Sequence, residues 1–141
     1  MDIKAALTEA YIKRGAILHS YEFEEIDHGK FFVIIGSNED NLYGFFFINS
    51  KINQYLRRKT ELYKMQIPLN HEEYSSFLDH NSFLDCHALT TIPKNKLEQQ
   101  FHNGKVHYKG DLSLEDLNIV MKTVRESDLF SDYDKETFFA D

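Results

Sequence analysis

The chain has 141 residues, of which 42% are hydrophobic and 28% charged, and this suits one globular domain with a real core. The net charge of −7 argues against broad, sequence-independent binding of nucleic acid, and no apolar run approaches the roughly 18 residues that span a bilayer. The single cysteine, Cys86, excludes an intramolecular disulfide, and the N-terminus lacks a signal-peptide core, so we expect a cytoplasmic protein without a membrane partner.

The N-terminal part of the chain predicts one helix and one strand. Apolar residues at helical spacing predict a short amphipathic helix over residues 2–14, which Gly15 ends. Residues 16–26 then alternate between aromatic and polar side chains, as a half-buried strand does.

Residues 29–50 predict a β-hairpin. Phe31–Ile35 is a continuous apolar run, typical of a strand that is buried on both faces. A polar loop at residues 36–41 leads to the return strand, Leu42–Ile48. Groups that can carry chemistry flank the paired strands, and they are His28, Lys30, Asn49, Ser50 and Lys51.

A basic segment follows the hairpin. Residues 51–66 carry five basic side chains against Glu61 alone, and residues 51–60 predict a loop or a short helix. Leu62–Leu69 predicts a strand in which Pro68 indicates an edge position. A basic loop beside a site can meet a phosphate even on an acidic protein, although the same charges also suit a solvated loop.

The second half of the chain alternates strands and helices. Ser82–Ile92 predicts a strand with Asp85 and His87 on one face and Cys86 on the other. The sequence then predicts a helix over Lys94–Phe101 and a brief strand over Lys105–Tyr108.

The C-terminal part predicts a helix and a tail. Ser113 to Asp116 forms a capping-box pattern that opens an amphipathic helix running to about Ser127. Residues 128–141 are acidic with interspersed aromatic residues, and we expect this tail to be poorly ordered. Residues 1–127 therefore form one α+β domain, a small, curled, mostly antiparallel β-barrel with flanking helices.

Metal and cofactor sites have little support in the sequence. His80 and His87 lie near Asp79 and Asp85, but no histidine pair shows the i, i+4 spacing of a zincin. Ordinary surface or hydrogen-bonded histidines are the alternative, and we favour it. No glycine-rich phosphate loop is present, and a core position suits Cys86 better than a nucleophilic one. We therefore predict no metal and no cofactor.

The remaining candidate chemistry is phosphodiester cleavage. Cleaving RNA without a metal needs a base for the 2′-hydroxyl, an acid for the leaving 5′-oxygen, and a cation for the phosphorane charge. Strand ends and one turn can bring together His28, Lys30, Ser50, Lys51 and His80. The alternative is that the lysines are solvated and that Ser50 is a turn residue.

The strand pattern resembles the PemK/MazF-like toxins, which are small SH3-like barrels. The matching stretches are Lys30–Ile35, Phe45–Ser50 and Ser82–Leu89. A lysine before one strand and a serine followed by lysine after its partner resemble the ToxN branch, whose antitoxin is an RNA. The chain departs from MazF proper at Gly29-Lys30, where MazF carries an Arg-Pro pair.

The resemblance implies a metal-independent endoribonuclease that cleaves single-stranded RNA to 2′,3′-cyclic phosphate and 5′-hydroxyl ends. Lys30 would stabilise the phosphorane and Ser50 would position the phosphate or pass a proton, while His28 and His80 are the candidate acid and base. The flanking phosphates would contact Lys51, Arg57 and Arg58. A cognate protein or RNA antitoxin and a homodimer are the partners expected of such a toxin.

A binding module is the alternative from a different functional class. In that hypothesis the barrel has lost its chemistry and binds a protein or peptide, and the acidic aromatic tail folds onto a partner or back onto the barrel. The tail could also lie across the basic segment 51–66 and mask it.

Overall fold

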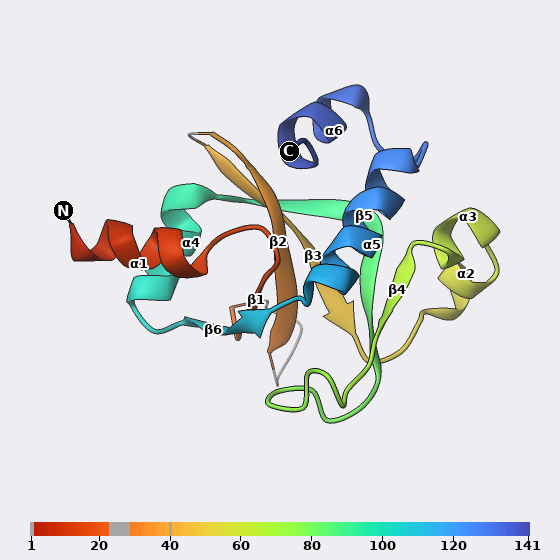
Figure 1. The fold of residues 1–141 in the computed structure, drawn as a ribbon, viewed down its shortest axis with the longest axis horizontal. Coiled ribbons are helices and arrows are strands. Elements are labelled where there is room, and N and C mark those ends of the chain that lie inside the picture. Colours follow the sequence, from red (N-terminus) through yellow and green to blue (C-terminus); the bar gives the residue numbers. More distant parts are fainter. Residues whose placement is uncertain (1, 23–28, 40) are drawn as a thin grey trace.

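The computed structural model describes residues 2–22, 29–39 and 41–141. An antiparallel sheet of six strands, in the order β4-β5-β3-β2-β1-β6, forms its centre (Figure 1). The strands are β1 (Ala16–Ser20), β2 (Lys30–Asn38), β3 (Leu42–Asn49), β4 (Gln66–Leu69), β5 (Ser82–Pro93) and β6 (Val106–Asp111). The helices are α1 (Ile3–Tyr11), α2 (Gln54–Arg57), α3 (Thr60–Tyr63), α4 (Lys94–His102), α5 (Leu114–Glu126) and α6 (Asp132–Phe138). The predicted α+β class is confirmed.

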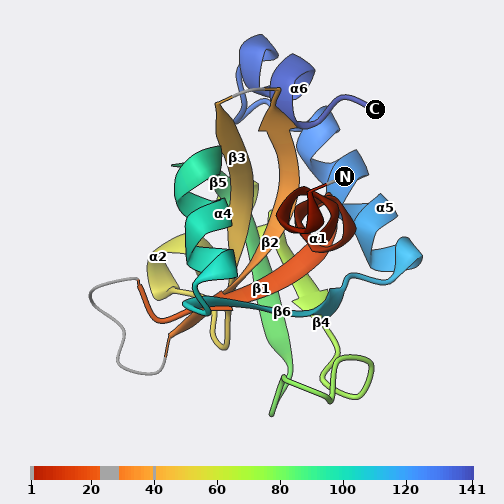
Figure 2. The ribbon, with the colours of Figure 1, turned by 90° about the vertical axis from the view of Figure 1, so that its left-hand side faces the viewer.

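The central strands of the sheet, β1, β2 and β3, are buried on both faces. Figure 2 shows α4 and α5 on opposite sides of the sheet. Val33 points into the hydrophobic cluster that includes Val120 of α5, whereas Phe32 points into the cluster that includes Leu97 of α4. This arrangement explains why the first hairpin strand is apolar at consecutive positions, and it confirms the burial of β2 on both faces.

The strand register brings distant polar residues to one end of the sheet. Phe31 pairs with Ile48, so the start of β2 lies beside the end of β3. On the other edge of β3, Phe47 pairs with Asp85 of β5, and Asp85 in turn pairs with Gln66 of β4. Four strands thus contribute residues to one end of the sheet.

Several element boundaries differ from the sequence-based expectation. The first helix ends at Tyr11, and the strand expected over Leu62–Leu69 starts only at Gln66, because helix α3 occupies residues 60–63. Pro68 lies exposed on β4, the edge strand, as predicted. The far end of the strand expected over residues 16–26 lies outside the described residues.

The C-terminal tail, which the composition predicts to be poorly ordered, is instead helical and packed. The Ser131 hydroxyl accepts a hydrogen bond from the Asp134 amide and caps α6. Phe138 and Phe139 are only 1% and 0% exposed, and both lie in the cluster that also contains Val33. Burial of these rings outweighs the unfavourable charge of the segment, because each ring removes a large apolar surface from water.

Two arginines hold the tail in place. The Arg14 guanidinium donates to the carbonyl oxygens of Phe138 and Ala140 at 3.0 and 2.7 Å, and Arg125 donates to the carbonyl oxygen of Phe139 at 2.6 Å.

No helix in the described part of the chain combines the length and the apolar character that crossing a membrane requires.

Candidate functional site

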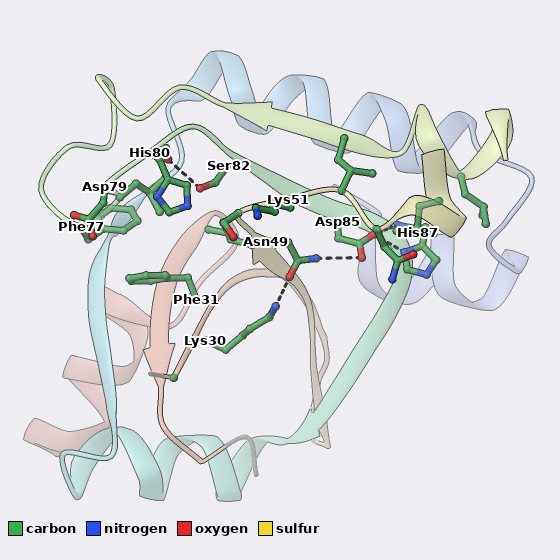
Figure 3. Close-up of a pocket in the computed structure, with 18 of the residues that line it drawn as sticks. Lys30, Phe31, Asn49, Lys51, Phe77, Asp79, His80, Ser82, Asp85 and His87 are labelled. Atoms are coloured by element: carbon green, nitrogen blue, oxygen red, sulfur yellow. Dashed lines mark hydrogen bonds and ion pairs between the residues drawn. The ribbon is translucent and has the colours of Figure 1, made fainter. Parts of the chain in front are cut away.

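A cleft of about 1270 Å³ opens at the end of the sheet where β2 begins and β3 ends. Several separate parts of the chain form its walls. Residues 29–31 and 48–53 contribute the strand ends, the α2–α3 segment closes one side, and the turn before β5 closes another. Asp85 and His87 of β5 also line the cleft (Figure 3). A concave site of this kind suits a ligand that enters it rather than a flat protein contact.

A chain of hydrogen bonds runs across the cleft. The Lys30 ammonium donates to the side-chain oxygen of Asn49, and the amide nitrogen of Asn49 lies 3.5 Å from Oδ2 of Asp85 (Figure 3). The other carboxylate oxygen of Asp85 accepts from Nε2 of Gln66 at 2.7 Å and from Nδ1 of His87. The carboxylate thus contacts side chains from three strands, and Asn49 extends the chain of hydrogen bonds to Lys30 on a fourth.

The Asp85 carboxylate orients the imidazole of His87. Because it only accepts hydrogen bonds, it selects the ring form with the proton on Nδ1, and Nε2 then becomes the acceptor. The backbone amide of His87 also donates to Asp85, at 3.3 Å. The Asp85 side chain is 14% exposed and that of His87 is 32% exposed. The carboxylate is therefore shielded, while the ring still reaches the cleft.

Lys30 is a half-buried cation beside this pair. Its ammonium lies 5.4 Å from the centre of the Phe47 ring. Burial lowers the pKa of Lys30 below its ordinary value, and the negative charge of Asp85 opposes that change. A partly desolvated ammonium held by one amide oxygen can bind an anionic group that enters the cleft.

Most of the predicted site residues that the structure describes come together in this cleft. Lys30, Ser50, Lys51 and His80 all line it. In contrast, the exposed side chains of Arg57 and Arg58, at the end of α2, lie outside its lining. His28 lies outside the described residues.

The sequence-based site did not include Asp85, His87 or Gln66. One signal was available, because Asp85 and His87 are separated by a single residue on a strand and therefore share a face. Gln66 gave no signal, since its contact with Asp85 depends on the pairing of β4 with β5.

Among the described residues, no three His, Cys, Asp or Glu side chains are grouped so that they could hold a metal ion.

Cys86 is fully buried, and this confirms the predicted core position. Burial raises the pKa of its thiol well above the ordinary value, so the reactive thiolate is disfavoured.

The sequence matches no model of a known protein family, and a comparison with curated proteins gives no match either. The PemK/MazF-like resemblance therefore remains a prediction from the strand pattern. The functional assignment depends on the residues of the cleft themselves.

Proposed function

We propose that the protein is a metal-independent endoribonuclease of the PemK/MazF/ToxN-like toxin type, which cleaves single-stranded RNA in this cleft. The observation that carries the proposal is the chain of contacts from Lys30 through Asn49 and Asp85 to His87 along one cleft. It places a cation and an oriented imidazole beside a space that can take a nucleotide. The curled antiparallel sheet is compatible with the SH3-like barrel of such toxins.

The reaction needs two proton transfers. In the first, Nε2 of His87 takes the proton of the 2′-hydroxyl, and the 2′-oxygen forms a bond to phosphorus. The bond from phosphorus to the 5′-oxygen then breaks, which leaves a 2′,3′-cyclic phosphate. His80, which lies on the other side of the cleft from His87 (Figure 3), gives a proton to the departing 5′-oxygen.

The cations stabilise the transition state and hold the strand. Lys30 balances the charge that develops on the phosphorane oxygens. Ser50 and Lys51, directly after β3, position the scissile phosphate. Arg57 and Arg58 contact phosphates further along the RNA, beyond the cleft. Because these contacts are few, RNA binding weakens only moderately as salt rises.

The position of the tail bears on the alternative hypothesis of a binding module. This hypothesis placed the aromatic tail either on a partner or back on the barrel, and the burial of Phe130, Phe138 and Phe139 in the core supports the second place. Masking of the basic segment by the tail has no support, because α6 lies away from α2 in Figures 1 and 2 and from α3 in Figure 1. A protein or RNA antitoxin and a homodimer remain part of the toxin proposal.

Growth after induced expression tests the toxin proposal. We expect wild type to arrest growth and Lys30→Ala to restore it. Lys109→Ala is the matched control, because Lys109 is an exposed lysine of β6 that does not line the cleft, and it should arrest growth like wild type. Normal growth with all three proteins, at equal amounts in the cleared lysate, would contradict the proposal.

A further inference from the structure

An array of aromatic rings forms one wall of the cleft. The ring of His19 lies 4.5 Å from that of Phe31, which lies 5.3 Å from that of Phe77. Tyr74 packs behind Phe77, with 6.2 Å between the ring centres. His19 and Tyr74 are buried, whereas Phe31 and Phe77 are half-buried and line the cleft. The two cleft-facing rings are thus held from behind by buried rings.

Apart from His80, the acid assigned to the departing 5′-oxygen, the turn that carries Phe77, which the structure describes in full, brings no basic side chain to the cleft. The turn that carries Phe77 also contributes Asp79 and His80 to the cleft, and Asp79 is anionic. The lysines that line the cleft, Lys30 and Lys51, come instead from the strand ends. A phosphate is therefore attracted to the strand ends, while the aromatic wall is left to a neutral, flat group.

We propose that Phe31 and Phe77 form a stacking subsite for the nucleobase of the nucleotide at the scissile phosphate. The inference rests on the proposed ribonuclease function and deepens it by adding a base-binding subsite. Alternation along β2 points the Lys30 and Phe31 side chains to opposite faces of the sheet, yet both line the cleft at the start of the strand. A nucleotide that lies across this strand end therefore contacts Lys30 with its phosphate and Phe31 with its base. Figure 3 shows Phe31 between Lys30 and Phe77.

Stacking on these rings requires an unpaired base. A base within a duplex has both faces covered by its neighbours, whereas a single-stranded base can leave them and stack on a protein ring. The subsite therefore selects single-stranded RNA, and it tolerates all four bases because each has a π-face. In this way the wall contributes to substrate choice without touching the reacting atoms.

Binding of a non-cleavable RNA tests the subsite. The cleavage position is first mapped with the wild-type protein. A 2′-deoxy nucleotide placed at that position then removes the attacking hydroxyl, so that the RNA binds but is not cleaved. An abasic residue is placed at one position after another, and Kd is measured by fluorescence anisotropy. We expect one abasic position, next to the cleaved bond, to weaken binding roughly 5-fold or more, as loss of base stacking does.

Phe77→Leu removes the ring and keeps an apolar side chain. We expect it to weaken binding of the intact RNA to the same extent and to abolish the additional penalty at that abasic position. Phe77→Tyr should restore the affinity and the penalty. Phe101→Leu, at a half-buried aromatic residue outside the cleft, should bind like wild type. If Phe77→Leu unfolds, Phe77→Met provides a second variant whose flexible side chain fills the space.

Two failures are distinguishable. If wild type cleaves RNA but the abasic penalty is equal in wild type and Phe77→Leu, the stacking subsite is overturned and the nuclease proposal stands. If wild type neither binds nor cleaves RNA, both proposals are overturned.

Discussion

Asp85 accepts a hydrogen bond from Nδ1 of His87, two residues further along strand β5. The alternation of a strand places both side chains on the cleft side, while Cys86 between them points into the core. The carboxylate fixes the direction and the proton position of the imidazole, as an acid–base catalyst requires. This pair, with Lys30, is the basis of the functional account.

Removing the imidazole or its carboxylate partner should impair cleavage. We expect His87→Ala to lower the cleavage rate about 10²- to 10⁴-fold, the usual contribution of a positioned acid or base. Asp85→Asn should lower it to a similar extent, because the amide no longer holds the proton on Nδ1. Single-turnover rates measure both effects. A His87→Ala rate within tenfold of wild type would rule out His87 as the base.

The pH dependence of cleavage should report on Lys30. Burial lowers its pKa below the ordinary 10.5, and the protonated ammonium is the active form. The contribution of Lys30 to the rate is therefore complete below the lowered pKa and is lost as pH rises through it, earlier than for an exposed lysine. Lys30→Arg should remove this alkaline decline, because a guanidinium stays charged. An unchanged decline in Lys30→Arg, corrected for spontaneous RNA hydrolysis, would assign it to another group.

Close packing of two glycines against the tail should make them sensitive to substitution. A Cβ at Gly36 would lie 2.0 Å from the carbonyl oxygen of Phe138, and one at Gly44 would lie 2.9 Å from its ring. We expect Gly36→Ala to lower the free energy of unfolding by about 1–3 kcal/mol, as overpacking does. Phe138→Ala should lower it by about 3–5 kcal/mol through the cavity it leaves.

Urea denaturation measures these changes, and Tyr133→Ala is the control. Tyr133 belongs to the same helix but is 59% exposed, so its removal should change the free energy of unfolding by less than about 1 kcal/mol. Equal effects of Phe138→Ala and Tyr133→Ala would show that the tail does not contribute to the core.

Tyr74 connects the turn before β5 to the start of α5. Its hydroxyl lies 2.5 Å from Oδ2 of Asp116, to which it donates, and it accepts from the amide of Ser113 at 3.1 Å. Burial, and then the hydrogen bond to Asp116, raises its pKa to about 12. The stabilisation is therefore complete below pH 10 and is lost as pH rises through about 12.

Tyr74→Phe should lower the free energy of unfolding at pH 7 by about 1–2 kcal/mol, because the part-buried Ser113 and Asp116 groups lose their hydrogen-bond partner. It should also flatten part of the alkaline decline in stability. Thermal unfolding at pH 7 and pH 11 provides the comparison. A variant as stable as wild type at pH 7 would indicate that water replaces the hydroxyl at no cost.

Local patterns predicted much of the fold. The hairpin of β2 and β3 has continuous apolar strands, and α5 has a capping box at Ser113, where the hydroxyl accepts from the amide of Asp116. Both patterns involve residues that are near one another in sequence, so they can be recognised without knowledge of the tertiary structure. Pro68 correctly indicated that β4 is an edge strand.

Long-range pairing limited the rest. Asp85 meets Asn49 only because β5 pairs with β3, and the two residues are 36 positions apart in the chain. The tail was predicted to be poorly ordered from its charge, yet Arg14 and the core retain it through contacts more than 120 positions away. Such contacts leave no periodic signal in a single sequence.

Cleavage of a single-stranded RNA by the purified protein in excess EDTA distinguishes a metal-independent ribonuclease from a protein that only binds. We expect cleavage with 2′,3′-cyclic phosphate and 5′-hydroxyl ends by wild type and Lys109→Ala, and a loss of at least 10²-fold in Lys30→Ala and His87→Ala. No cleavage by folded wild-type protein, or equal cleavage by all four proteins, would contradict the ribonuclease proposal.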